Sequence, residues 1–235
     1  MIQRYIYLLM ILGTVLTSCG EIDNYDYPNG SIYGVLTDSI TNEPLQSEQP
    51  NGFNVKLFEK GGVLSIPIVI AGRPDGSYEN ALIFQNEYKV LPTEGPFFEY
   101  TGRDTIKVQV GKRTEVNFKV MPYLAITDVT VTPAAGQVTV TYKIVRQRAD
   151  QGSVGKINQR ITLVSRVPEV SNRVYDFRKL TSLTSVPDAT ILTTTYTDVV
   201  TGLTSGKKYW VRVATRTSNS LSRFNYSKTF EVTIP

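Results

Sequence analysis

Residues 203–213 read LTSGKKYWVRV, a polar turn followed by a run of alternating side chains. Because successive side chains of a β-strand point to opposite faces, Tyr209 and Val211 share one face of this run. Trp210 and Arg212 share the other face. The apolar face is typical of a strand that covers a core, so the segment predicts a β-sheet with one buried side.

The chain from residue 30 onward continues this pattern. Short runs rich in Val, Ile, Thr, Tyr and Phe are separated by Gly, Pro, Asn and Asp, and no stretch keeps a helical period for a dozen residues. The pattern predicts an all-β fold of the sandwich type. A length of 235 residues suits two consecutive β-sandwich domains of about a hundred residues each.

We place the two domains at residues 30–121 and 122–235, because a proline after a strand marks a natural boundary. Residues 111–113 predict the tip of a hairpin between two strands. Residues 168–188 predict a long loop, with a helical turn around residues 175–180. The expected strands cover residues 31–37, 53–59, 66–71, 87–91, 104–110, 114–120, 126–132, 137–147, 160–166, 190–198, 207–217 and 226–234.

The first domain resembles a known fold. GVLTD at residues 34–38 and TNEPL at 41–45 resemble the opening of the carboxypeptidase-regulatory, transthyretin-like sandwich. PDGSY at 74–78 and EYKV at 87–90 resemble the middle of the same sandwich, and an Asp-Gly pair supplies the positive φ that such a turn needs. The resemblance covers most of the first domain and implies its fold, not an activity.

The stretch at 203–213 resembles strand F of fibronectin type III domains. The spacing from Leu203 to Tyr209 is that of a tyrosine corner, in which the tyrosine hydroxyl bonds to the chain just upstream. Ser205 stands where these domains usually have proline, and Tyr142 is the residue that could fill the place of their usual tryptophan. The resemblance implies a fibronectin-like sandwich for the second domain.

The amino terminus reads MIQRYIYLLMILGTVLTSC, with a cation ahead of a dozen mostly apolar residues. This run is too short for a membrane-spanning helix of about 20 residues and suits a signal peptide. Its end, residues 16–19, resembles the bacterial lipobox. The resemblance implies a lipoprotein signal peptide at residues 1–18 and lipidation of Cys19, with several acyl chains as a stable anchor. The alternative is a plain secretory signal that ends at a chance cysteine.

Residues 19–29 are polar, acidic and turn-prone, which predicts a flexible tether. An acidic run directly after a lipidated cysteine resembles the export signal of surface-exposed lipoproteins in saccharolytic Gram-negative gut bacteria. The resemblance implies a lipid-anchored protein of the outer membrane that is exposed at the cell surface. The leaflet of the outer membrane that holds the lipid stays open.

The composition argues against several kinds of function. Histidine is absent, which removes the commonest general acid–base group and the commonest metal ligand. A single cysteine allows neither an internal disulfide nor a thiolate zinc site. The net charge of +4 comes from scattered basic residues, so nucleic acid is not an expected partner. No pair of carboxylates is placed for glycoside hydrolysis, and we expect no catalytic residue, metal or cofactor.

The remaining features favour carbohydrate binding, because aromatic rings bury the apolar faces of sugars while polar neighbours bind the hydroxyls. Trp210 and Arg212 face away from the predicted core and form one candidate pair. The other candidates are Phe97, Phe98 and Tyr100, in a loop with flanking glycines. The alternatives are that this loop packs its aromatics over the sandwich end, and that Trp210 lies beneath the long loop or against the first domain.

The combination of a lipobox, a regulatory-type sandwich and a fibronectin-like sandwich resembles small lipoproteins encoded beside starch-utilisation-type outer-membrane transporters. The resemblance implies a non-catalytic surface lipoprotein, accessory to polysaccharide capture and uptake. Its partners would be membrane lipid through acylated Cys19, a polysaccharide and a transporter complex. The alternative is a structural spacer or a docking subunit of the transporter complex without a ligand of its own.

Overall fold

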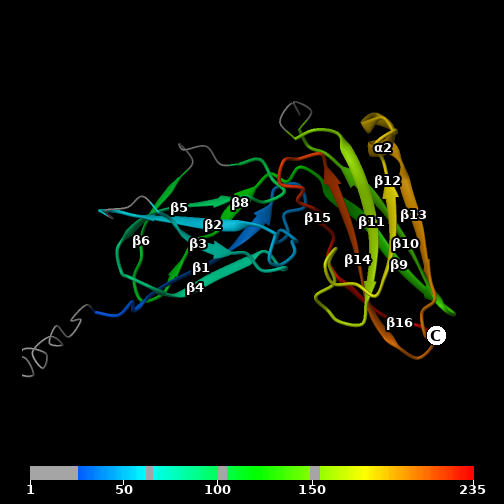
Figure 1. The fold of residues 1–235 in the computed structure, drawn as a ribbon, viewed down its shortest axis with the longest axis horizontal. Helices are drawn as coiled ribbons and strands as arrows, with labels where there is room; N and C mark the ends of the chain where they lie inside the picture. The colour runs from blue at the N-terminus through cyan, green and yellow to red at the C-terminus, as the bar shows by residue number, and fades with distance from the viewer. Residues whose placement is uncertain (1–25, 62–65, 100–104, 149–153) are drawn as a thin grey trace, which may run out of the picture.

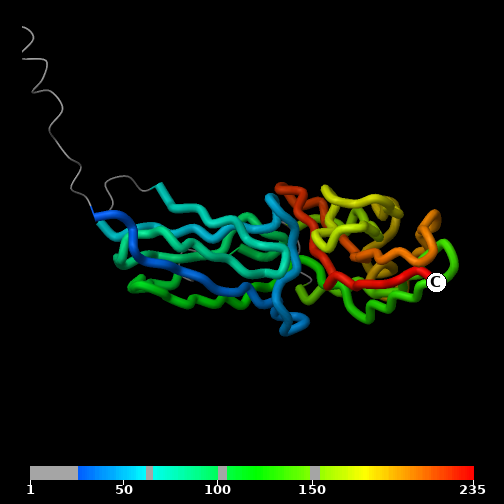
Figure 2. Tube along the Cα trace, turned by 90° about the horizontal axis from the view of Figure 1, so that it is seen from below, coloured from blue at the N-terminus to red at the C-terminus, as the bar shows by residue number. Residues whose placement is uncertain are grey.

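The computed structural model describes residues 26–61, 66–99, 105–148 and 154–235. These residues form two β-sandwiches that follow one another along the long axis of an elongated molecule (Figures 1 and 2). The strands of the second sandwich run across the direction of those of the first (Figure 1). The expected all-β sandwich class is therefore confirmed. The expected signal peptide at residues 1–18, the expected lipidation site Cys19 and the start of the expected tether lie outside the described residues. Within those residues, no helix is long and apolar enough to span a membrane.

The first sandwich packs two sheets against each other. Its strands are β1 (Gly30–Asp38), β2 (Asn54–Glu59), β3 (Ile68–Ala71), β4 (Ser77–Ile83), β5 (Glu87–Thr93), β6 (Ile106–Gln109), β7 (Thr114–Glu115) and β8 (Phe118–Val120). One sheet has the order β4-β1-β7, with β8 also paired to β1, and the other has the order β3-β2-β5-β6. Buried and less buried residues alternate along β1 and β2, because one face of each strand covers the core.

The middle of β1 shows how closely the first sandwich is packed. Ile32 and Leu36 point into the core and are fully buried. Between them, a Cβ added at Gly34 would lie 1.8 Å from the carbonyl oxygen of Val116, so only glycine allows this close approach. The hydroxyl of Tyr78 donates a hydrogen bond to the same carbonyl at 2.6 Å.

The second sandwich also packs two sheets against each other. Its elements are β9 (Ala125–Ala134), β10 (Gln137–Val145), β11 (Ile157–Ser165), β12 (Phe177–Ser182), α2 (Asp188–Thr193), β13 (Thr195–Thr201), β14 (Lys208–Thr217), β15 (Asn225–Tyr226) and β16 (Phe230–Thr233). One sheet has the order β13-β10-β9, and the other has the order β12-β11-β14-β15, with β16 also paired to β14. Tyr209, Val211 and Val213 face the core between these sheets, as the alternation predicts.

The hairpin expected at residues 111–113 is wrong. The strand before it, β6, pairs antiparallel with β5, whereas β7 and β8 after it pair parallel with β1. The segment therefore carries the chain from one sheet of the first sandwich to the other. Side-chain alternation indicates which face of a strand is buried, but it does not indicate which strand lies beside it. The expected hairpin rested only on the nearness of the two strands in the sequence.

Three further strand expectations are corrected. The helical turn around residues 175–180 is wrong, because β12 occupies most of this stretch and pairs with β11. The strand expected at 190–198 begins only after α2, whose first turn is held by Asp188 Oδ2 at 2.7 Å from Arg146 Nη1. The strand β4 has no counterpart among the expected strands, because polar and exposed residues interrupt its alternation.

The two sandwiches meet at a polar junction beside β15. Asn225 binds both sides of it, since its Oδ1 accepts the N–H of Leu124 at 3.2 Å and its Nδ2 donates to the carbonyl of Pro96 at 2.9 Å. Arg223 Nε donates to the carbonyl of Glu94 at 3.0 Å. These bonds hold the second sandwich against the segment that follows β5, so the two sandwiches have a defined mutual orientation.

Candidate functional site

The loop between β11 and β12, residues 166–176, is closed at its base by an ion pair. Arg166 Nε and Nη2 donate to Asp176 Oδ1 at 3.1 and 2.6 Å, and the main-chain N–H of Arg166 donates to Oδ2 at 2.7 Å. These bonds from Arg166 hold the pKa of the Asp176 carboxyl below its ordinary value. Asp176 is therefore charged at neutral pH, and the two ends of the loop have a fixed geometry.

The tip of the loop folds back onto the outer face of the sheet that contains β11 and β14. Main-chain hydrogen bonds between Ser171 and Val174 run in both directions, at 2.9 and 3.1 Å, and form a tight turn. Val170 is fully buried against the sheet, and the N–H of Asn172 donates to the hydroxyl of Tyr226 at 3.2 Å. The loop is thus held at its tip as well as at its base.

Two hollows share the Arg166–Asp176 pair as a common wall. The first hollow, of about 540 Å³, is lined by Ser165, Arg166, Val167, Arg173, Val174, Tyr175 and Asp176. Tyr175 is 37% exposed, and the guanidinium carbon of Arg178 lies 4.8 Å from its ring centroid. The first hollow therefore brings an aromatic ring together with a carboxylate and several guanidinium groups.

The second hollow lies against the tyrosine corner. It measures about 350 Å³ and is lined by Arg166, Asp176, Phe177, Thr204, Lys207 and Tyr209. The hydroxyl of Tyr209 accepts the main-chain N–H of Thr204 at 3.1 Å, which confirms the upstream hydrogen bond that the sequence predicts. The same hydrogen bond lowers the pKa of Tyr209 below its ordinary value.

Trp210 lies on the outer face of β14, as the alternation predicts, but only part of its ring is accessible. Its partners in the neighbouring strands are Ser165, which lines the first hollow, and Glu231. Trp210 therefore lies beside the first hollow and under the loop, not on an open sheet face. It packs against a cluster formed by Ile161, Leu163, Val170, Ala214, Phe224 and Tyr226.

The expectation that Arg212 is open to a ligand is corrected by its burial. The side chain points away from the core of the second sandwich, but the first sandwich covers it and leaves it 2% exposed. Arg212 Nη1 donates to the carbonyls of Ser47 and Val170 at 2.8 and 3.3 Å, and Nε donates to the carbonyl of Ser227 at 2.9 Å. Burial lowers the pKa of Arg212 to about 10, so the guanidinium stays charged at neutral pH.

Tyr226 extends this buried contact across the junction. The guanidinium carbon of Arg212 lies 4.4 Å from the centroid of its ring, and the Tyr226 hydroxyl donates to Glu48 Oε2 at 2.7 Å. Burial raises the pKa of Tyr226 well above its ordinary value. Arg212 and Tyr226 from the second sandwich thus bind main-chain and side-chain groups of the first, so they stabilise the junction and do not face solvent.

The aromatic residues of the loop after β5 do not share one environment, because one lies in the core of the first sandwich and another lies near the surface. Phe97 is fully buried in the core of the first sandwich, which corrects the expectation that it is available for binding. Phe98 is half-buried, with its ring centroid 5.3 Å from that of Tyr123 and 4.4 Å from the guanidinium carbon of Arg148. Tyr100 lies outside the described residues. Neither Phe97 nor Phe98 lines the hollows of the β11–β12 loop.

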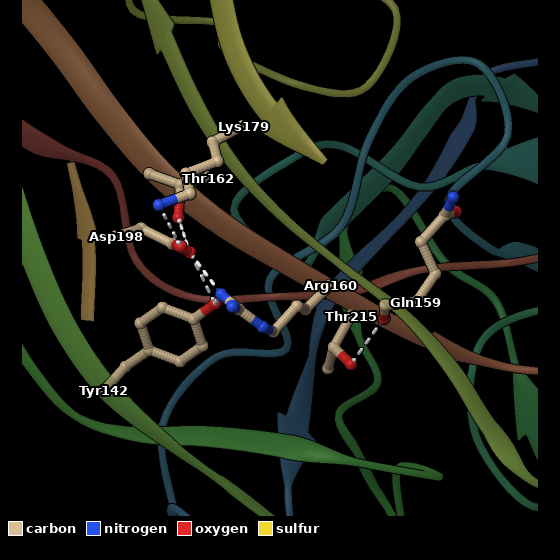
Figure 3. Close-up of polar contacts among 7 residues, drawn as sticks. All are labelled: Tyr142, Gln159, Arg160, Thr162, Lys179, Asp198 and Thr215. Carbon is tan, nitrogen blue, oxygen red and sulfur yellow. Dashed lines mark hydrogen bonds and ion pairs between the residues drawn. The ribbon is translucent and has the colours of Figure 1, made fainter. Parts of the chain in front are cut away.

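A buried ion cluster lies between the two sheets of the second sandwich (Figure 3). Asp198 on β13 is fully buried, and its Oδ2 accepts from Arg160 Nη1 at 2.5 Å and from Thr162 Oγ1 at 2.8 Å. The Tyr142 hydroxyl donates to the same oxygen at 2.9 Å, and Lys179 Nζ lies 3.3 Å from Oδ1. Burial by itself raises the pKa of Asp198, but the bonds from Arg160 and Thr162 outweigh it and hold the pKa below its ordinary value.

The described residues that line the two loop hollows include no hydrolytic pair of carboxylates. Asp198 is closed off from solvent, and Asp176 is the one carboxylate among the residues that line the two loop hollows. Glycoside hydrolysis needs two carboxyl groups across a cleft. In the part of the chain that the structure describes, no group of three Asp, Glu or Cys side chains is placed to hold a metal ion. The loop can instead bind a ligand by stacking and hydrogen bonding.

The residues of the two hollows were beyond the reach of sequence reasoning. The sequence predicts a long loop with a helical turn over residues 168–188, so it indicates neither β12 nor the true ends of the β11–β12 loop. The available signal was a tyrosine between two arginines, Arg173 and Arg178, since aromatic and guanidinium groups recur together at binding surfaces. Only the pairing of β12 with β11 places these side chains around one hollow.

Part of the chain matches a known protein family. Residues 31–121, which hold the strands of the first sandwich, match the family described as "Protein of unknown function (DUF3823) N-terminal domain". No curated protein matches the chain. The description of this family names no activity.

Several crystal structures share the fold across both sandwiches. A DUF3823 family protein from Bacteroides uniformis ATCC 8492 is 22% identical, with a TM-score of 0.75 over 88% of this chain and 100% of its own. A DUF3823 family protein from Parabacteroides merdae ATCC 43184 is 19% identical, with a TM-score of 0.73 and the same coverage. A second Bacteroides uniformis ATCC 8492 structure, described as a "putative carbohydrate binding protein", is 21% identical, with a TM-score of 0.69 over 88% and 100%. At these identities, the likeness establishes the β-sandwich fold.

Proposed function

We propose that this chain is a non-catalytic, lipid-anchored protein of the outer-membrane surface that binds carbohydrate and assists polysaccharide capture and uptake. The observation that carries the binding part is the first hollow, of about 540 Å³, in which Tyr175 lies with Arg173 and the Arg166–Asp176 pair. Sugar rings offer apolar faces to an aromatic ring, and their hydroxyls bind both carboxylate and guanidinium groups. The carbohydrate-binding description of one structure with the same fold agrees with this class of ligand.

The anchoring part rests on the lipobox-like residues 16–19. A mass spectrum of the amino terminus of the exported chain is expected to show a diacylglyceryl group and an added acyl chain on Cys19. Cys19→Ala is expected to abolish labelling with radioactive palmitate and to release the chain from the membrane fraction. An unmodified first residue would contradict the anchor. Protease treatment of intact cells tests surface exposure separately, because only an outward-facing chain is cleaved.

The binding part is tested by retention of the exported chain on immobilised plant and host polysaccharides. Tyr175→Ala is expected to weaken retention about tenfold, because it removes the stacking ring from the first hollow. The matched control is Tyr27→Ala, since Tyr27 is 81% exposed and precedes β1 of the first sandwich. Equal retention of the two variants, or no retention of the unaltered chain by any polysaccharide, would contradict the proposal.

A structural spacer or docking subunit of a transporter complex is the second candidate function. The observation that favours it is the junction, where buried Arg212 and Asn225 hold the two sandwiches together in an elongated molecule (Figure 2). Such a rod would set a distance from the membrane without a ligand of its own. Co-purification with a transporter, together with no retention on any polysaccharide, would favour this function. A change of complex assembly in Trp210→Ala without a change in retention would do the same.

A further inference from the structure

The residues that line the two loop hollows carry more positive than negative charge, with Arg166, Arg173 and Lys207 against Asp176. The loop also contains Glu169, which lines the hollow at the junction instead. The guanidinium of Arg166 is already paired with the carboxylate of Asp176. Arg173 lines the first hollow, Lys207 lines the second, and Arg178 covers Tyr175. Among the residues that the structure describes, no carboxylate pairs with Arg173, Arg178 or Lys207. Two unpaired cations, Arg173 and Lys207, therefore line the two hollows, and a third, Arg178, lies over Tyr175. The one carboxylate that lines them, Asp176, is already paired with Arg166.

Two hollows at the junction hold more carboxylates than the loop hollows do. The hollow of about 600 Å³ at the junction contains Asp75 and Glu169 opposite its cations. The hollow of about 180 Å³ at the same junction is lined by Asp38, Glu43 and Asp128. The net charge of the whole chain is only +4. The cluster of cations around the two loop hollows is therefore a local feature. Unpaired cations around the two hollows favour a negatively charged ligand there.

We infer that the ligand of the two loop hollows is an acidic polysaccharide, whose sugars bear carboxylate or sulfate groups. This inference rests on the proposed carbohydrate binding and names its substrate class. Arg173 and Lys207 bind the anionic groups, because charge-assisted hydrogen bonds to guanidinium and ammonium groups are stronger than those of neutral pairs. Tyr175 binds the apolar face of a neighbouring sugar. Because the two hollows share one wall, a chain of several linked sugars fits them better than a single sugar.

A polymer suits this site better than an anionic bilayer. The first described residue, Asp26, lies at the end of the first sandwich that is remote from the second sandwich (Figures 1 and 2). A chain anchored by its amino terminus therefore carries the loop on the second sandwich, with the first sandwich between this domain and the membrane. The loop also surrounds hollows with its cations, whereas a membrane surface is bound by a flat basic patch with protruding apolar groups.

Binding of the exported chain to polygalacturonate and to dextran sulfate tests the inference, with neutral galactan and unsubstituted dextran as matched controls. Biolayer interferometry on immobilised polymer measures the affinity. Binding to at least one acidic polymer is expected to exceed that to its neutral counterpart at least about tenfold and to fall as salt is added. Polygalacturonate and dextran sulfate distinguish carboxylate from sulfate as the recognised group.

Three variants distinguish binding at the loop hollows from a general effect of the net charge of the chain. Arg173→Gln and Lys207→Gln are each expected to weaken binding of the acidic polymer about five- to tenfold, because each removes one charge-assisted contact. Lys89→Gln makes the same change of charge at an exposed position of the first sandwich and is expected to have no effect. Trp210 fluorescence verifies that each variant is folded.

The possible results have distinct meanings. Equal binding of neutral and acidic polymers, with loss in Tyr175→Ala but not in Arg173→Gln, would overturn the acidic ligand and leave carbohydrate binding in place. No binding of any polymer would overturn both. Tighter binding to vesicles with anionic phospholipid, through the same arginine and lysine, would assign the loop to a membrane and overturn the inference.

Discussion

Replacement of Asp198 by asparagine is expected to destabilise the second sandwich by about 3 kcal/mol. The carboxylate is fully buried and accepts from Arg160, Thr162 and the Tyr142 hydroxyl between the two sheets (Figure 3). An amide keeps the shape but lacks the charge, which leaves the guanidinium of Arg160, 11% exposed, with no anion beside it. Breaking a buried ion pair by removing one partner costs about 3–5 kcal/mol, and the retained carbonyl oxygen of the amide places Asn at the lower end.

Urea unfolding followed by tryptophan fluorescence measures this loss directly. The chain has one tryptophan, Trp210, and it lies in the second sandwich, so its emission reports the unfolding of that sandwich. A loss of about 3 kcal/mol corresponds to a fall in melting temperature of roughly 10 °C or more for a sandwich of this size. The control is Glu231→Gln, which breaks an exposed pair with Lys208 at 2.7 Å and is expected to cost about 0–1 kcal/mol.

The reasoning would be refuted if Asp198→Asn lost no more stability than Glu231→Gln. That outcome would mean that the buried cluster costs as much in desolvation as it returns in hydrogen bonding. A variant that replaces Asp198 and Arg160 together by apolar residues separates the two contributions. It is expected to be more stable than Asp198→Asn alone, because no uncompensated charge remains buried.

Two further predictions follow from buried polar groups. The pKa of Asp198 in the folded chain is below its ordinary value of 3.8, so its contribution to stability is complete above about pH 4 and is lost as the pH falls through the folded value. As acid is added, the free energy of unfolding should therefore fall more steeply for the unaltered chain than for Asp198→Asn. Parallel curves for the two proteins would contradict this. Arg212→Met keeps the aliphatic stem but leaves the carbonyls of Ser47, Val170 and Ser227 without their donor, at about 1–3 kcal/mol for each carbonyl that water cannot reach. Small-angle X-ray scattering should then show a broader range of sandwich orientations, whereas an unchanged scattering profile would show that Arg212 does not hold the junction.

Alternation along single strands was predictable, and so was the turn chemistry around Tyr209. Both depend on contacts within a few residues of each other. The exposure of candidate residues was not predictable in the same way. Trp210 and Arg212 lie on the expected face of β14, yet Arg212 is buried because Ser47, 165 positions earlier in the chain, comes to lie against it. Phe97 is buried for a similar reason, since its neighbour across an isolated bridge is Pro122.

The amino-acid sequence by itself determined that this protein is an all-β chain, which face of most strands is buried, and that histidine-dependent chemistry is excluded. Only the tertiary structure decided which strands are neighbours, where the outer face of β14 is covered, and how Arg166, Arg173 and Asp176 come to surround one hollow. The physical reason is the range of the interactions. Side-chain alternation acts between adjacent residues, whereas the pairing of strands and the packing of the two sandwiches depend on contacts between distant residues, which no local pattern encodes.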